Sequence, residues 1–149
     1  MRTSTPLRGI ADPTHKLRLV RREREAYLAE LHTPDLGMSD KTREAALYIH
    51  RHFFEETCTV QQLKGDLSIR DHNFSSYFKR TMGLGLKEYI LHHRLTLAKR
   101  LLRHRELSIF LIALSVGFCS HEAFTMAFKV HQNCTPSSFR NQLDQQNPT

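Results

Sequence analysis

The sequence has little glycine, proline and cysteine, and it lacks a long apolar segment. Six glycines and five prolines in 149 residues are too few for a fibrous or linker protein. The longest apolar stretch, residues 109–119, is broken by Ser115 and Gly117 and is far shorter than the roughly 20 residues that span a bilayer. The 40% of hydrophobic residues suffice for one modest core. These features exclude a wholly disordered or membrane-spanning protein and predict a soluble globular domain.

The usual motifs of enzymes and metal sites are also missing. The three cysteines, Cys58, Cys119 and Cys134, are odd in number and widely spaced, which indicates reduced thiols rather than disulfides or a zinc knuckle. The ten histidines show no ligand spacing, and phosphate-binding glycine loops, nucleophile elbows and paired carboxylates are absent. The N-terminus lacks the apolar region of a secretory signal. We therefore expect no enzyme activity, no metal or other cofactor, and a cytoplasmic location.

The basic surplus lies in the second part of the chain. Residues 1–40 hold 7 basic and 6 acidic side chains, whereas residues 41–149 hold 15 and 9 and carry a charge of +6. A surplus of this size often serves only solubility. It indicates nucleic-acid binding when the basic residues lie on or beside elements that fit a groove of the duplex.

Helical periodicity without an alternating strand pattern predicts an all-α fold after residue 40. We expect three short helices and a long one. The first ends at about Glu56, Thr59 caps the second, the third runs from near Asp71 to Gly83, and the long helix covers residues 86–104. The long helix would serve as a rigid linker.

The pattern of a short helix, a turn and a second helix then repeats about 50 residues later. The second helix of each copy has the pattern Phe-x-x-x-Phe-Lys, which starts at Phe74 in the first copy and at Phe124 in the second. Such an internal duplication is typical of two helix-turn-helix units.

The turn of such a unit requires particular residue types. A small residue is needed where the two helices cross, and a glycine four residues later can adopt the left-handed turn. Ala113 and Gly117 meet these requirements in the second unit, whereas Lys64 and Ser68 stand at the corresponding places in the first. The first unit is therefore the less regular copy.

A set of short motifs occurs in order over about residues 41–140. It comprises Phe78-Lys79, Gly83, Tyr89, Arg94, Ala98, Leu101-Leu102, Ser108-Ile109, Ile112-Ala113, Val116-Gly117-Phe118, Phe124, Phe128-Lys129, Thr135-Pro136 and Phe139-Arg140. This set resembles the signature of the AraC/XylS family of bacterial transcription regulators. The resemblance implies two homeodomain-like helix-turn-helix subdomains, over 41–83 and 108–140, joined by the linker helix over 86–104. A polar tail over 141–149 would follow.

The resemblance also implies the function. We expect a sequence-specific regulator of double-stranded DNA, an activator that also contacts RNA polymerase and binds DNA as a monomer at the nucleoid. Its two recognition helices would enter successive major grooves, which recur about every 34 Å on one face of the duplex. A linker of about 18 residues spans about 27 Å, which suits this spacing.

Polar side chains on the two expected recognition helices are the candidate DNA contacts. Asparagine can pair with adenine, glutamate with cytosine, and threonine or methionine can pack on the thymine methyl group, whereas basic side chains suit phosphates. The base-contacting candidates are His72, Asn73, Ser75, Ser76, His121, Glu122, Thr125 and Met126. The phosphate-contacting candidates are Lys79, Arg80, Lys129 and Arg140. Tyr89, Arg94 and Ala98 are assigned to the scaffold.

Some positions depart from the family pattern. Ser76 and Met126 stand where many relatives carry an arginine on the recognition helix, and Asn133 replaces a glycine but tolerates a left-handed conformation. The irregular first unit and the two missing arginines favour an alternative, a degenerate double helix-turn-helix module that acts through contacts with another regulator or with RNA polymerase. A third interpretation, a thiol-based redox sensor, rests on Cys119 alone.

The N-terminal tail, residues 1–40, contains the pattern of an amphipathic helix over 14–31. Such a helix usually packs on its own domain, although a dimerisation helix or a basic arm over phosphates is also conceivable, and the nearly balanced charge disfavours the arm. We expect no small-molecule effector domain, because only about 40 residues precede the DNA-binding region. The chain would then be a short regulator or a fragment of a longer one.

Three apolar residues, Phe110, Leu111 and Leu114, are expected to form a surface patch. The other face of their helix already supplies the core residues. A patch of this kind usually has a cover, and we expect the helix over 14–31 or RNA polymerase to supply it.

Overall fold

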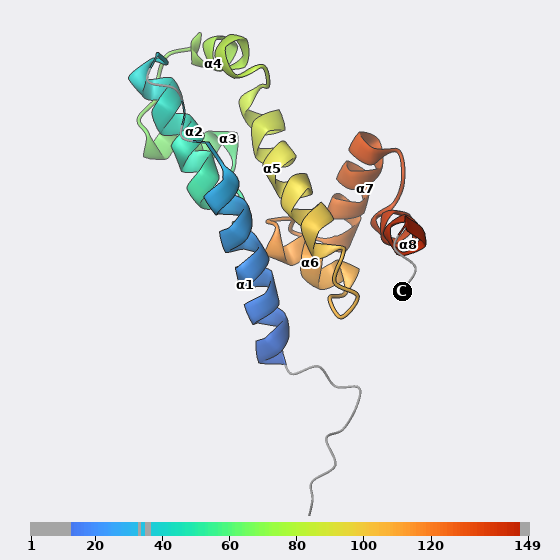
Figure 1. Ribbon diagram of the computed structural model, residues 1–149. Helices are drawn as coiled ribbons and strands as arrows, with labels where there is room; N and C mark the ends of the chain where they lie inside the picture. Colours follow the sequence, from blue (N-terminus) through green and yellow to red (C-terminus); the bar gives the residue numbers. More distant parts are fainter. Residues whose placement is uncertain (1–12, 33, 35–36, 147–149) are drawn as a thin grey trace, which may run out of the picture.

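The computed structural model describes residues 13–32, 34 and 37–146, and every regular element in this part of the chain is a helix. The helices are α1 (Pro13–Glu30), α2 (Asp40–His52), α3 (Val60–Asp66), α4 (Phe74–Met82), α5 (Leu86–Leu101), α6 (Ile109–Ser115), α7 (His121–Gln132) and α8 (Pro136–Gln146). In Figure 1, α5 runs between a group formed by α2, α3 and α4 and a second group formed by α6, α7 and α8. The predicted all-α fold with two helix-turn-helix units and a linker helix is confirmed.

Side-chain caps fix where four of the helices start. Ser39, Thr59, Ser108 and Ser120 have extended backbones, and the side chain of each accepts a hydrogen bond from the amide three residues later. Each cap satisfies one amide that has no partner within the helix. The caps at Thr59 and Ser108 therefore fix the start of the first helix in each helix-turn-helix unit.

The two Phe-x-x-x-Phe-Lys patterns place their rings in the core. Phe78, Phe124 and Phe128 are fully buried and Phe74 is nearly so, while Lys79 and Lys129 are exposed. Because both rings of each pair point inward, the opposite face of α4 and of α7 is left to solvent.

Each helix-turn-helix unit makes its turn with one left-handed residue. This residue is Gly117 in the second unit, with φ +102°, and Ser68 in the first, with φ +54°. The amide that follows donates to an equivalent carbonyl in both turns, Phe118 to Ala113 at 3.0 Å and Ile69 to Lys64 at 2.8 Å. The irregular first unit therefore keeps the same turn, but Ser68 carries backbone strain of about 1–2 kcal/mol that glycine avoids.

We predict that Ser68→Gly increases the free energy of unfolding by about 0.5–1 kcal/mol, the relieved strain less the extra entropy of glycine in the unfolded chain. Urea denaturation measures this value, and Ser68→Ala is the control because alanine keeps the strain. A lower stability of Ser68→Gly than of Ser68→Ala would contradict this account of the turn.

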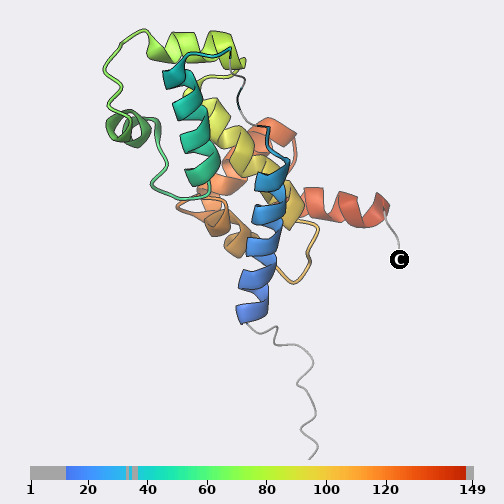
Figure 2. The ribbon, with the colours of Figure 1, turned by 60° about the vertical axis from the view of Figure 1, so that its left-hand side comes forward.

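Helix α1 packs beside α5, antiparallel to it, as Figures 1 and 2 show. Val20 and Tyr27 are buried. The Tyr27 hydroxyl lies 2.6 Å from His93 Nδ1, and Glu23 pairs with His104 at the other end of the contact. The helix expected over 14–31 is thus present as α1, and its apolar face is used against α5.

This position of α1 leaves the expected patch on α6 uncovered. Phe110 is 55% and Leu114 43% exposed, whereas Leu111 is half-buried and packs against the core. The expectation that the N-terminal helix covers these residues is wrong, because the buried side chains of α1 are used along α5. The exposed patch on α6 consists of Phe110 and Leu114.

His93 of α5 is buried where α1, α2 and α5 meet. Its ring is 4% exposed and lies among the rings of Tyr27, His50, Phe53 and Tyr89. Burial, with a smaller contribution from the neighbouring His50 and His92, lowers the pKa of His93 from 6.5 to about 3. The imidazole is therefore neutral in the folded protein at physiological pH.

We predict that this histidine makes the fold sensitive to acid. Between pH 6.5 and about 3 the unfolded chain binds a proton at His93 and the folded chain does not, so the free energy of unfolding falls as pH falls, by up to about 1.4 kcal/mol per pH unit. His93→Gln, which has no titrating group, should show a shallower slope in urea denaturation at several pH values. The control His131→Gln, at an exposed position, should keep the wild-type slope, and an unchanged slope in His93→Gln would disprove the assignment.

Candidate nucleic-acid interface

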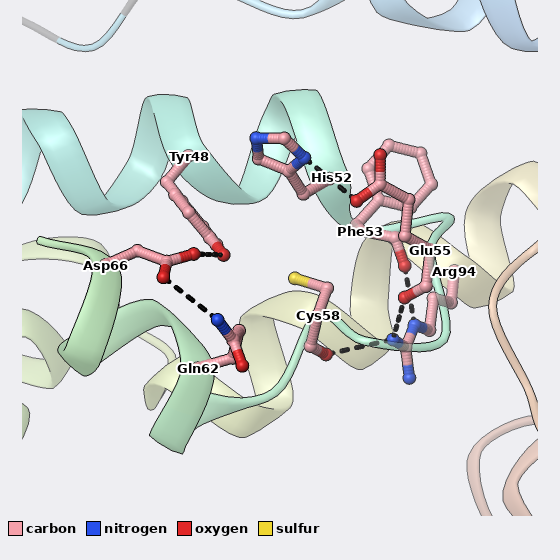
Figure 3. Close-up of polar contacts among 8 residues, drawn as sticks. All are labelled: Tyr48, His52, Phe53, Glu55, Cys58, Gln62, Asp66 and Arg94. Carbon is pink, nitrogen blue, oxygen red and sulfur yellow. Dashed lines mark hydrogen bonds and ion pairs between the residues drawn. The ribbon is translucent and has the colours of Figure 1, made fainter.

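An arginine of the linker helix fastens the start of the first helix-turn-helix unit. Arg94 Nε donates to the carbonyl of Phe53 at 2.7 Å, and Nη2 donates to the carbonyls of Glu55 and Cys58 at 2.9 and 3.0 Å. Figure 3 shows the guanidinium reaching these oxygens in the segment between α2 and α3. The assignment of Arg94 to the scaffold is therefore confirmed.

The same view shows a second link between α2 and α3. Tyr48 of α2 donates to Asp66 at 2.6 Å, and Gln62 donates to the other oxygen of that carboxylate at 2.9 Å. The short helix α3 is thus held at both ends, by the arginine before it and by the carboxylate at its end.

Arg140 of α8 makes the corresponding contacts in the second unit. Its Nε donates to Leu102 at 3.0 Å, and Nη2 donates to His104 and Leu107 at 3.1 and 2.8 Å. These acceptors have the same spacing as those of Arg94, at the first, third and sixth positions of the segment before the short helix. The structure gives Arg140 a role inside the fold, and we leave it out of the phosphate-contacting set.

We call each set of three hydrogen bonds from one arginine to backbone carbonyls a clamp. The two clamps, of Arg94 and of Arg140, also explain where α2 and α5 end. The sequence predicted helices to about Glu56 and to residue 104, but α2 ends at His52 and α5 at Leu101. The carbonyls that would continue each helix accept hydrogen bonds from Arg94 or Arg140 instead. Both segments therefore turn sharply toward the next short helix.

The candidates of the first unit lie on and just before α4. The helix begins at Phe74, later than predicted, so His72 and Asn73 lie in the preceding turn. The Asn73 amide donates to Asp71 Oδ1 at 2.9 Å, which shapes this turn as an Asx turn. The exposed candidates are His72, Asn73, Ser76, Lys79 and Arg80, and Ser75 is half-buried.

The candidates of the second unit lie on α7. His121, Glu122, Met126 and Lys129 are exposed, and Met126 is 70% exposed. Thr125 is half-buried, and its hydroxyl oxygen is buried without a hydrogen-bond partner among the described residues. Thr125 is thus less accessible to a base than its neighbours.

Val130 was missed by the sequence analysis although it is 74% exposed. It follows Met126 by four residues, and Met126 follows Glu122 by four, so the three side chains share one stripe of α7. The helical spacing alone could have revealed this apolar extension of the candidate face.

Two grooves that share part of their lining lie beside α5. The larger, of about 530 Å³, lies between α3, α5 and α7 and is lined by Ile90, Leu91, Ala123 and Ala127 among others. The smaller, of about 400 Å³, is lined by Ser75, Ser76 and Lys79 of α4. Val60 and Lys87 line both grooves.

Three candidates of α4, Ser75, Ser76 and Lys79, line the smaller groove. Helix α7 lines the larger groove with Ala123 and Ala127, which are not among the candidates. Lys87, an exposed cation that lines both grooves, was not among the predicted contacts. The sequence offered no signal for it, because its place between the units depends on the packing of three helices.

A comparison with protein families identifies this architecture. The helix-turn-helix domain family matches residues 65–142, which is more than half of the chain. The chain belongs to the AraC family of helix-turn-helix transcription regulators. The relatives in this family are transcription regulators and not enzymes.

Individual relatives agree with this family. The arabinose operon regulatory protein of Escherichia coli is 27% identical over 122 residues, which are 82% of this chain and 41% of that protein. The Msm operon regulatory protein of Streptococcus mutans is 41% identical over 84 residues, 56% of this chain and 30% of that protein. The chain spans about a third to a half of the length of most such relatives.

A solved structure of the family shows the same fold. The C-terminal domain of AraT, a response regulator from Geobacillus stearothermophilus, is 27% identical and superposes with a TM-score of 0.67 over 71% of this chain and 88% of that domain. Within the described residues of the present chain, no helix is long and apolar enough to cross a bilayer. The same residues contain no group of three or more side chains suited to hold a metal ion.

We predict that Arg140 acts on stability and not on phosphate binding. Arg140→Met should lower the free energy of unfolding by about 2 kcal/mol, because the fork of charge-assisted hydrogen bonds is lost. It should leave the slope of log affinity for DNA against log salt unchanged.

The matched control is Lys129→Met, at an exposed position next to the buried Phe128. This variant should keep its stability within about 0.5 kcal/mol and lose about 0.9 in the salt slope if Lys129 contacts a phosphate. Urea denaturation and binding titrations at several salt concentrations give both quantities. If Arg140→Met keeps the wild-type stability and has a smaller salt slope, Arg140 contacts a phosphate and the prediction is wrong.

Proposed function

We propose that the chain is a sequence-specific DNA-binding activator that inserts α4 and α7 into successive major grooves on one face of the duplex. The observation that supports this most is that α4 and α7 each line a groove beside α5, and that the two grooves share Val60 and the exposed cation Lys87. A monomer suffices for this mode of binding, because one chain holds both reading helices. The proposal includes a cytoplasmic location at the nucleoid.

Base contacts come from the exposed polar side chains of the two reading faces. Asn73 suits adenine, Glu122 suits the amino group of cytosine, and Met126 suits the thymine methyl group. His72, Ser75, Ser76, His121 and Thr125 are further candidates of the same faces. Neither face has a central arginine for guanine, so we expect modest discrimination that depends partly on DNA shape.

Phosphate contacts come from the exposed cations beside these faces. Lys79 and Arg80 follow the reading face of α4, and Lys129 follows that of α7. Lys87, which lines both grooves between the units, is added as a contact to the backbone that separates the two major grooves. These charges supply affinity that is independent of sequence and dependent on salt.

RNA polymerase is the proposed protein partner of the activator. Phe110 and Leu114 lie four residues apart on α6 and are exposed, so together they offer a small apolar surface. The same exposed pair supports the second candidate function, a degenerate module that binds another regulator and reads DNA poorly.

Selection of the protein on random duplexes tests the proposal. We predict that the wild type enriches a site with two short half-sites, and that Asn73→Ala and Glu122→Ala each lose preference in one half only, at about 1–3 kcal/mol per lost base contact. The matched control is Arg51→Ala, on an exposed position of α2 outside both reading faces, which should enrich the wild-type motif. If no motif is enriched, or if both reading-face variants return the wild-type motif, the protein-interaction function is favoured.

A further inference from the structure

The turn of the second unit packs directly against the clamp of the first. Gly117 is buried and has φ +102°. A Cβ atom at this position would lie 2.8 Å from Arg94 Nε and 2.8 Å from the Phe53 carbonyl oxygen, distances that real Cβ atoms essentially never show. The next residue, Phe118, places its ring centre 5.7 Å from the guanidinium carbon of Arg94. We name this contact, made by Arg94, Phe53, Gly117 and Phe118, the inter-unit joint.

The inter-unit joint is a second connection between units that α5 already links through the chain. A single connection through α5 and residues 102–107 fixes the distance between the units but permits rotation about the connecting segment. The inter-unit joint holds the second unit at a point away from that segment. Because it lies away from that segment, the inter-unit joint restricts the rotation of the second unit relative to the first.

One side of the inter-unit joint leads to the recognition helix α7 within a few residues, and the other side leads to α3, the first helix of the other helix-turn-helix unit. On one side, Phe118 packs on Phe124 of α7 with ring centres 5.3 Å apart. On the other side, Arg94 binds the carbonyl of Cys58, directly before the cap of α3. A shift at the inter-unit joint therefore moves α7 relative to the first unit.

We propose that Arg94 and Gly117 are positioning residues that determine which spacing between two half-sites the protein accepts. This inference rests on the proposed function, in which α4 and α7 read two successive grooves. Neither residue needs to touch DNA, because each acts through the relative placement of the two recognition helices.

The chain offers a matched control for each positioning residue. Gly83 also has a positive φ, +82°, but a Cβ atom there would meet nothing within 4 Å, so Gly83→Ala adds backbone strain alone. Arg140 holds three carbonyls with the same spacing as those of Arg94, all of them in the second unit. A change in DNA binding that comes only from a strained turn will also appear in Gly83→Ala. A change that comes only from the loss of an arginine's hydrogen bonds will also appear in Arg140→Met.

The experiment measures binding to duplexes that carry the selected half-sites at the preferred spacing, with one base pair inserted or deleted, or with one half-site only. One inserted base pair adds about 3.4 Å and about 35° of rotation. The wild type should lose at least about tenfold in affinity on either change of spacing. Gly117→Ala and Arg94→Met should lose less than about threefold in affinity when the spacing is changed in the same way. Their affinity for a duplex with a single half-site should stay within about threefold of the wild-type value.

The controls Gly83→Ala and Arg140→Met should keep the wild-type dependence on spacing. Circular dichroism at the assay temperature checks that each variant is folded. If Gly117→Ala or Arg94→Met is unfolded, Arg94→Lys, which retains the positive charge but not the forked guanidinium, replaces it. If the folded variants of Arg94 and Gly117 lose as much affinity as the wild type on a changed spacing, the positioning role is disproved. If the wild type itself binds one half-site as well as two, the proposed two-groove function fails, and the inference fails with it.

Discussion

The fold depends on one repeated interaction, an arginine fork that holds three backbone carbonyls at the end of a helix. Carbonyls at a helix end have no partner within the helix, and a buried one without a partner costs about 1–3 kcal/mol. The planar guanidinium offers several donors in fixed directions, so Arg94 and Arg140 can each satisfy three such carbonyls. The chain can therefore turn sharply after α2 and after α5, and each turn ends at the cap of the next short helix, Thr59 or Ser108.

The short helices that begin at these two caps position α4 and α7. Both α3 and α6 end in the same left-handed turn, formed by Ser68 and by Gly117, and the paired phenylalanines of α4 and α7 then fix which face is buried. The exposed face of α4 carries the polar candidates, and that of α7 combines polar side chains with the apolar Met126 and Val130. Lys87 lines both grooves beside α5. The sequence difference between the two units thus changes the strain of the first turn and leaves the architecture in place.

The sequence predicted the features that depend on local patterns and missed those that depend on contacts between distant segments. Helix periodicity, caps and the duplicated Phe-x-x-x-Phe-Lys pattern were sufficient for the all-α fold and for the exposed faces of α4 and α7. The ends of α2 and α5 and the role of Arg140 could not be predicted, because the guanidiniums that decide them come from about 35 to 40 residues further along the chain. The place of Lys87 and the buried hydroxyl of Thr125 likewise result from tertiary packing.

The central claim is that one chain reads two successive major grooves on one face of DNA, and footprinting of the bound wild type tests it most directly. Hydroxyl-radical cleavage of a selected duplex should show two protected segments on the same face, and dimethyl sulfate should show guanines protected in two major grooves with centres about 10 base pairs apart. A single protected segment, or two segments on opposite faces of the duplex, would contradict the account.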